Sequence, residues 1–303
     1  MKIVVIGAGA MGSIYGGHLS LNNEVFLVDI NKDNVAQINK DGVKIDEDGV
    51  TNTYRPTAVT SSEEIGAADL VLLFLSSTLS KGALDGNKNL FGPDTRLLTL
   101  QNGAGHENLL MQYVPKEHVI IGTTEDNGAV LGLGHVRRGG TGITNVGLLT
   151  EDTDGFLPKL KEAFDCCGFD VRIQENIQQL IWDKLFINVS LSAVTAILQV
   201  DMGYIAANEF AWNMTKQLIH EAVTTAHALG LVADEEAITE KVKKTSENSP
   251  LGRTSIRVAL EQGRKTEVDT ISGAVVRAAE KCGLKVPAHE FVVNMVHAME
   301  GKS

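Results

Sequence analysis

The first twelve residues, MKIVVIGAGAMG, determine how the N-terminal half of the chain folds. An apolar run, Lys2–Ile6, leads directly into a glycine-rich turn, and a helical pattern over Met11–Leu21 follows. In such a strand–turn–helix unit the first glycine permits the tight turn. The second lets the backbone approach a diphosphate, and the third lets helix and strand pack closely. Together with the free N–H groups of the helix N-terminus, the pattern predicts a dinucleotide site formed by Gly7, Ala8, Gly9, Ala10, Met11 and Gly12.

A second apolar run, Val25–Asp29, ends in an acidic residue at the spacing typical of a ribose-binding carboxylate. Asp29 can accept hydrogen bonds from the adenosine ribose hydroxyls, and its charge repels a 2′-phosphate. A solvated aspartate at a strand end is the alternative interpretation, and Lys32 is close enough in sequence to reach a phosphate. On balance, the pattern predicts NADH in preference to NADPH.

Further apolar runs follow along the first half, at Asp69–Leu75, Arg96–Leu100 and His118–Gly122. Because they alternate with helical patterns, they predict a parallel, doubly wound sheet. The glycine-dense segment Gly128–Gly147 contains short strand-like runs, which we interpret as antiparallel edge strands joined by tight turns.

The second half is helical in character. Apolar positions recur at helical spacing over residues 214–226 and Glu267–Cys282, and a last helix is expected from Pro287 to Gly301. The fold class predicted is therefore α/β, with an N-terminal Rossmann doubly wound sheet followed by an all-helical C-terminal domain. We place the dinucleotide-binding domain at residues 1–174 and the helical substrate domain at residues 175–303.

Composition excludes several functional classes. The chain has 303 residues, 43% of them hydrophobic and 21% charged, with a formal net charge of −11. That balance supports globular domains with sizeable cores. Its acidic sign argues against binding to nucleic acid or to an anionic membrane surface.

The longest apolar run, Leu185–Val200, is interrupted by polar residues, so it predicts a buried core helix rather than a membrane span. The cysteines, Cys166, Cys167 and Cys282, form neither a disulfide framework nor a metal-binding spacing. The apolar run at the N-terminus is too short for a signal peptide. We therefore expect a soluble cytoplasmic protein without a metal site.

Two segments carry candidate catalytic residues. Asn102 follows the run Arg96–Leu100, at the edge of the sheet where α/β proteins bind ligands, although asparagine is also a common turn former. Lys184, Asn188 and Ser192 are spaced i, i+4 and i+8, so they fall close to one face of an apolar helix. Burying a lysine and an amide without partners is costly, which predicts that this face meets a polar cleft. A lysine extending to solvent is the alternative.

Ser255 and Glu267 lie in short polar segments that could be no more than helix starts. Their spacing does not show that they meet Lys184.

Taken in this order, these residues resemble the ketopantoate reductase family over nearly the full length of the chain. The resemblance rests on the glycine-rich turn, Asn102-Gly103, the Trp-x-Lys-x-x-x-Asn helix at Trp182–Asn188, and Ser255 followed by Glu267. It implies a Rossmann domain and a helical domain with the active site between them, in an enzyme of pantothenate biosynthesis. The roles that it implies are Lys184 as general acid, Glu267 as a carboxylate that binds the substrate hydroxyl and supports the lysine, and Asn102, Asn188, Ser192 and Ser255 as substrate ligands.

The chain also departs from the family pattern. Members that use NADPH place an arginine after the second strand and a lysine after the third, where this chain has Ile30 and Ser76. Both substitutions agree with NADH, and we expect Ser76 and Asn102 to contact the cofactor. Ser192 replaces a further asparagine of the family, and residues 255–259 differ from its Ser-Met-Leu-Gln-Asp-like stretch. The identity of the substrate therefore stays open.

Three hypotheses remain. The leading one is an oxidoreductase that reduces a branched 2-oxo acid, with 2-dehydropantoate to D-pantoate as the first candidate. The second is an NAD-dependent D-2-hydroxy-acid dehydrogenase of the D-mandelate type, acting on bulky apolar 2-oxo acids; these enzymes look similar too, including in the turn at residues 102–107. The third is a non-catalytic nucleotide-sensing protein, against which the joint presence of Lys184, Asn188 and Glu267 argues. The expected partner is a small-molecule 2-oxo acid, and a homodimer is considered because dimers are common.

Overall fold

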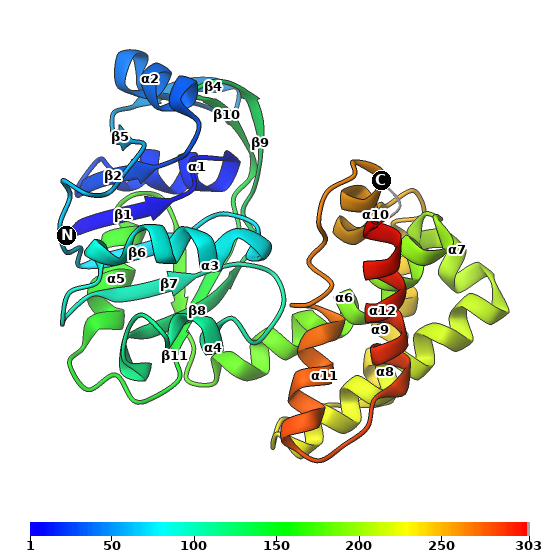
Figure 1. The fold of residues 1–303 in the computed structure, drawn as a ribbon. Coiled ribbons are helices and arrows are strands. Elements are labelled where there is room, and N and C mark those ends of the chain that lie inside the picture. The colour runs from blue at the N-terminus through cyan, green and yellow to red at the C-terminus, as the bar shows by residue number, and fades with distance from the viewer. Residues whose placement is uncertain (302–303) are drawn as a thin grey trace. The chain divides into compact units, whose positions relative to one another are not determined.

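The computed structural model describes residues 1–301, which form two compact units (Figure 1). The first unit consists of residues 1–101 and 106–177, and the second of residues 102–105 and the chain from Gln178 onward. The short turn at residues 102–105 therefore belongs to the helical unit, although it follows a strand of the first. Its Ala104 N–H donates a hydrogen bond to the Thr270 carbonyl, 2.8 Å away.

An eight-stranded sheet forms the centre of the first unit, in the order β12-β11-β8-β7-β6-β1-β2-β5. Its strands are β1 (Lys2–Ile6), β2 (Glu24–Val28), β5 (Thr57–Val59), β6 (Leu70–Leu73), β7 (Arg96–Thr99), β8 (Val119–Thr124), β11 (Ile143–Leu148) and β12 (Asp170–Ile173). All neighbouring strands run parallel except β8 and β11. The five runs predicted as parallel strands are confirmed, and every residue of β6 and β7 is buried, as in a sheet covered on both faces.

The connecting segments of this unit are short helices. They are α1 (Ala10–Leu19), α2 (Lys32–Asp41), α3 (Ser77–Gly86), η1 (Lys88–Leu90), α4 (Glu107–Leu110), η2 (Lys116–His118) and α5 (Phe156–Asp165). Helix α1 is buried along most of its length, including its glycines, because it lies directly against β1 and β2. A Cβ atom on Gly16 would lie 2.3 Å from a methyl carbon of Leu27, so this helix approaches the sheet more closely than larger residues allow.

A second, four-stranded sheet has the order β4-β3-β10-β9. Its strands are β3 (Val43–Glu47), β4 (Val50–Tyr54), β9 (Asn127–Gly132) and β10 (His135–Gly140). The segment Gly128–Gly147 was expected to supply only edge strands, and here the prediction is partly wrong. Strand β9 is an edge strand, but β10 pairs with β3 as well, and β11 lies inside the large sheet between β8 and β12. The antiparallel pairing of β9 with β10 is as predicted, while β11 is antiparallel to β8, a strand that precedes this segment.

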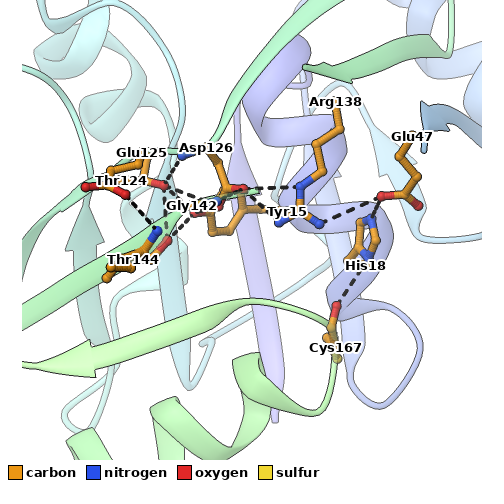
Figure 2. A network of polar contacts seen from close by, with 11 residues as sticks. Tyr15, His18, Glu47, Thr124, Glu125, Asp126, Arg138, Gly142, Thr144 and Cys167 are labelled. Atoms are coloured by element: carbon orange, nitrogen blue, oxygen red, sulfur yellow. Dashed lines mark hydrogen bonds and ion pairs between the residues drawn. The ribbon is translucent and has the colours of Figure 1, made fainter. Parts of the chain in front are cut away.

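Buried charges join α1 to the second sheet (Figure 2). Arg138, on β10, lies with its Nη2 2.7 Å from Oδ1 of Asp126, and the two side chains are only 3% and 0% exposed. The same guanidinium lies 3.8 Å from the Glu47 carboxylate, which in turn contacts His18 Nε2 at 3.0 Å. The hydroxyl of Tyr15 donates to Asp126 Oδ2 at 3.0 Å. These contacts tie the C-terminal ends of β3 and β10 to one face of α1.

Burial sets the protonation states in this network. It lowers the pKa of His18 against the opposing effect of the Glu47 carboxylate, while Arg138 lowers it further. Burial, followed by the nearby Asp126 carboxylate, raises the pKa of Tyr15. The Tyr15 hydroxyl therefore remains a hydrogen-bond donor at neutral pH.

The second unit is helical, as predicted. In its described part every regular element is a helix: α6 (Ile177–Leu198), α7 (Met202–Ala207), α8 (Glu209–Ala228), α9 (Glu235–Asn248), α10 (Ser255–Glu261), α11 (Ser272–Lys281) and α12 (Pro287–Glu300). One expectation is wrong in detail, because Glu267 precedes α11 in a turn instead of lying inside the helix. The side chain and backbone N–H of Thr266 both bond to Glu300 at 2.7 Å, which fixes the turn before the helix starts.

Helix α6 has the length and hydropathy of a membrane span, alone among the helices within residues 1–301. Its most apolar window is 67% buried inside the protein. That burial is typical of a core helix, which is what the polar interruptions of Leu185–Val200 predicted.

The buried ion pair provides a stability test. Replacing Arg138 with Met leaves the Asp126 and Glu47 carboxylates buried without their cation, so we expect the free energy of unfolding to fall by about 3–5 kcal/mol. The matched control is Lys244→Met, which breaks an exposed pair with Glu240 and is expected to cost less than about 1 kcal/mol. Urea denaturation measures both, and equal losses in the two variants would contradict the importance of the network.

Candidate active site

The glycine-rich turn has the backbone conformation and the close contacts that are typical of a dinucleotide-binding turn. Gly7 has a φ of +99°, a conformation that favours glycine. A Cβ atom on Gly12 would lie 1.8 Å from the Gly7 carbonyl oxygen, so only a glycine allows α1 to start here. A Cβ atom on Gly9, by contrast, meets nothing within 4 Å. The space in front of Gly9 is therefore open to a ligand, at the N-terminus of α1.

Asp29 fastens this turn to the end of β2. Its Oδ2 accepts a hydrogen bond from the Ala8 N–H at 2.7 Å, and its Oδ1 accepts one from the Asn31 N–H at 2.8 Å. A carboxylate has about four acceptor positions, so each oxygen can still accept a hydrogen bond from a ribose hydroxyl. The structure thus places the residue beside the turn, where the sequence pattern expected it.

A pocket of about 430 Å³ opens beside Asp29. It is lined by Ala8, Gly9, Ser13, Asp29, Asn31, Asn34, Val130, Gly132, Leu133, Gly134 and Val136. One wall is polar and belongs to the glycine-rich turn and α2, while the other is largely apolar and belongs to the β9–β10 hairpin. An amphipathic ligand such as a nucleoside fits this division of polar and apolar surface.

Asn34 holds the two walls of the pocket together and was missed by sequence reasoning. Its Nδ2 donates to the Ala8 carbonyl at 3.1 Å, and its Oδ1 accepts from the Gly134 N–H at 2.8 Å. Asn34 lies in the first turn of an ordinary surface helix, and Gly134 lies a hundred residues away. No local pattern marks such a long-range bridge, and only the fold reveals it.

The two positions that depart from NADPH-using members follow the strands β2 and β6. Ile30, directly after Asp29, is 93% exposed. Ser76 precedes α3 as its N-terminal capping residue, and its hydroxyl lies 3.1 Å from that of Thr78. The chain therefore presents an apolar side chain and a hydroxyl where the family pattern has two cations.

In the helical unit, α6 carries the residues expected to bind substrate. Lys184 is exposed, Asn188 is half-buried and Ser192 is buried. Because they are spaced by about one helical turn, the face that they share runs from the helix surface into the interior of the unit. The exposure of Lys184 is what the alternative interpretation, a lysine extending to solvent, expects, while Asn188 and Ser192 continue the polar face toward the interior.

Ser255 is brought next to this face. The hydroxyl of Thr254 donates to the Ser192 carbonyl at 3.3 Å and lies 2.8 Å from the hydroxyl of Thr195. Ser255 is the next residue, exposed at the start of α10. On the same helix, the positive charge of Arg257 is neutralised by ion pairs with Asp201 and Glu261.

Asn102 and Glu267 lie in adjoining turns of the same unit. The Thr270 carbonyl accepts the hydrogen bond from Ala104, and the Thr270 N–H donates to the Glu267 carbonyl at 3.1 Å. Gly103 has a φ of +100°, and a Cβ atom there would lie 2.2 Å from the Thr270 oxygen. The glycine after Asn102 is thus required by a close approach to the segment that carries Glu267, a constraint that the sequence alone did not show.

Comparison with known proteins agrees with this geometry. Residues 3–151 match the family model described as ketopantoate reductase PanE/ApbA, and residues 176–300 match its C-terminal counterpart. The 2-dehydropantoate 2-reductase of Streptococcus pyogenes serotype M6 is 30% identical over 99% of this chain and 98% of its own length. The Pyrococcus horikoshii protein of the same name is 31% identical, with the same coverage of both chains.

Among solved structures, a ternary complex of D-mandelate dehydrogenase with NADH and anilino(oxo)acetate is similar, with a TM-score of 0.87 and 28% identity over 99% of each chain. A PanE/ApbA family ketopantoate reductase from Ralstonia eutropha JMP134 also has a TM-score of 0.87, with 26% identity over 100% of this chain and 99% of its own.

The parallel sheet and the glycine-rich turn after its first strand in sequence define a Rossmann-type dinucleotide-binding fold. The matches over both halves show that the chain belongs to the ketopantoate reductase family of NAD(P)-dependent oxidoreductases.

Two glycine substitutions separate folding from cofactor binding. Gly9→Ala adds a methyl group to open space, so we expect unchanged thermal stability but at least about tenfold weaker NADH binding, equivalent to about 1.4 kcal/mol. Gly12→Ala forces α1 away from the Gly7 carbonyl and should destabilise the first unit itself. Differential scanning fluorimetry and NADH titration distinguish the two. Wild-type NADH affinity in Gly9→Ala would show that the diphosphate does not approach this turn.

Proposed function

We propose that the protein reduces a branched 2-oxo acid with hydride from NADH, and that 2-dehydropantoate, reduced to D-pantoate, is the leading substrate. The observation that carries the proposal is the polar face of α6, where Lys184, Asn188 and Ser192 lead from the surface into the helical unit. The full-length similarity to reductases of 2-dehydropantoate supports this choice of substrate.

A 2-oxo acid is reduced by adding hydride to C2 and a proton to the oxygen that becomes negatively charged. A bound nicotinamide supplies the hydride. Protonated Lys184 stabilises the developing alkoxide and donates the proton to its oxygen. Glu267 keeps the lysine charged and oriented, and accepts a hydrogen bond from a substrate hydroxyl. Asn102, Asn188, Ser192 and Ser255 supply the remaining hydrogen bonds to the substrate, and Asn102 also contacts the cofactor.

A second candidate is an NAD-dependent D-2-hydroxy-acid dehydrogenase that acts on bulky apolar 2-oxo acids. The similarity to D-mandelate dehydrogenase, a structure solved with NADH, favours it. The pair Asp29 and Ile30 suits NADH in both candidates and does not distinguish them.

A substrate panel decides between the candidates. We expect the highest kcat/KM with 2-dehydropantoate when that acid and phenylglyoxylate are compared at matched NADH. A higher kcat/KM with phenylglyoxylate would favour the dehydrogenase. If no 2-oxo acid is turned over, the remaining hypothesis is a non-catalytic nucleotide-sensing protein.

The preference for NADH rests on charge. The Asp29 carboxylate stands beside the ribose pocket, where it repels a 2′-phosphate. Ile30 offers this phosphate no positive charge. Ser76, at the start of α3, offers a hydroxyl to the cofactor in place of a cation.

The cofactor preference can be reversed by two substitutions. We expect higher kcat/KM with NADH than with NADPH for the wild type. The double variant Asp29→Asn, Ile30→Arg should move the ratio toward NADPH by about 10–100-fold, since a hydrogen bond to a charged group contributes about 1.5–3 kcal/mol. Ile30→Met is the matched control and should leave the ratio unchanged. A wild-type preference for NADPH would overturn the assignment of Asp29.

Removing the proposed acid should affect chemistry and spare cofactor binding. Lys184→Met is expected to lower kcat by about 10²–10⁴-fold, the usual contribution of general acid catalysis, while the Kd for NADH stays the same. Lys243→Met, which removes an exposed lysine of α9, is the control and should be fully active. A Lys184→Met enzyme with normal turnover would show that another group donates the proton.

We also propose that the enzyme works in the cytoplasm, a reducing compartment in which its cysteines remain thiols, as they are in the structure. The homodimer considered above is tested by light scattering of the purified protein.

A further inference from the structure

Two neighbouring thiols lie at the end of α5, and neither is a residue assigned to the reaction. Cys166 is exposed and Cys167 is 2% exposed, and their Sγ atoms are 3.9 Å apart. The side-chain amide of Asn22 lies 3.5 Å from the first sulfur and 3.7 Å from the second. Gly168 follows with a φ of +86°, and turns the chain away from the pair. Both sulfurs therefore point to one side, under the same amide.

This spacing does not suit a disulfide. Consecutive Cα atoms lie about 3.8 Å apart, whereas disulfides join Cα atoms about 4.4–6.8 Å apart and bring the sulfurs to about 2.05 Å. Oxidation of the pair would require a strained backbone between Cys166 and Cys167.

The spacing does suit two sulfurs bound to one central atom. Two sulfurs that bind one atom through bonds of about 2.3 Å cannot lie more than about 4.6 Å apart, so at 3.9 Å both Sγ atoms are within reach of a single centre. Zinc itself needs four ligands, and within residues 1–301 no cluster of three His, Cys, Asp or Glu side chains is present. Soft metal and metalloid atoms bind thiolates well. One that already carries a non-protein substituent and needs only two sulfur ligands from the protein fits this pair.

We propose that Cys166 and Cys167 form a bidentate binding site for a monosubstituted trivalent arsenical, R–As(III). The reaction joins R–As=O to the two thiols with formation of two As–S bonds and release of one water, which takes up both thiol protons. Arsenic remains trivalent and no electrons are transferred. The exposed Cys166 attacks first, because burial raises the pKa of Cys167 to about 11 and leaves little of its thiolate. Cys167 then closes the ring.

The site is separate from the cofactor cradle. The Cys167 carbonyl is 3.2 Å from His18 Nδ1, and its sulfur is 4.0 Å from the Leu19 carbonyl, so the pair adjoins the C-terminal end of α1 (Figure 2). Gly9 caps the other end of this ten-residue helix, about 15 Å away at about 1.5 Å per residue. Binding of the arsenical and binding of NADH can therefore be measured independently.

Phenylarsine oxide is the probe, and intact-mass spectrometry is the measurement. We expect one phenylarsenic group per chain in the wild type and in Cys282→Ser. It should be retained in excess glutathione and removed by 2,3-dimercaptopropanol. Cys166→Ser and Cys167→Ser should each lose the adduct to glutathione, because two linked contacts bind about 10²–10⁴-fold more tightly than one.

Either of two results would overturn the proposal. In the first, glutathione removes the phenylarsenic group from the wild type as readily as from the single variants. In the second, Cys166→Ser keeps the group in excess glutathione. Cys166 is exposed, so its serine variant should fold normally, and circular dichroism verifies this. If Cys167→Ser fails to fold, Cys167→Ala takes its place, and the Cys166→Ser result alone remains decisive.

Discussion

The absence of a side chain at Gly12 is the constraint on which the nucleotide half depends. With the Gly7 carbonyl 1.8 Å from where a Cβ atom would lie, any other residue would push α1 off β1. The close approach leaves the N-terminus of α1 directed at the open space before Gly9. It also brings Ala8 within 2.7 Å of the Asp29 carboxylate. A single steric requirement thus places the helix N-terminus, the turn and the Asp29 carboxylate together.

The same helix organises the second sheet. Tyr15 and His18, further along α1, contact Asp126 and Glu47, and Arg138 neutralises both carboxylates in a buried setting. Buried ions are stable only when each is paired, so this network fixes where β10 lies. The β9–β10 hairpin then forms the apolar wall of the pocket beside Asp29. The buried ion network and the pocket beside Asp29 are therefore linked through one helix.

Much of this could be predicted from sequence because the signals are local. The apolar runs and the glycine spacing predicted the parallel strands and the turn, and the ordered motifs predicted the family, as the matches over both halves confirm. The failures involve weak or distant signals. Strand β4 is polar and mostly exposed, and β5 is only three residues long, so no apolar run marks either. Strand β3 alternates, with Val43 and Ile45 buried, but over only five residues. The helix expected from Glu267 starts later because Glu300, far along the chain, holds Thr266.

The sequence by itself determined the class of fold, the nucleotide turn and the candidate residues of α6, since each follows from the spacing of neighbouring residues. Tertiary structure decided which distant groups meet. It placed the turn after Asn102 against Thr270, made Asn34 the bridge between α2 and the β9–β10 hairpin, and set two cysteine sulfurs under one amide. The physical reason is that hydrogen bonds and close contacts act over a few ångströms in space, and their partners can lie anywhere along the chain.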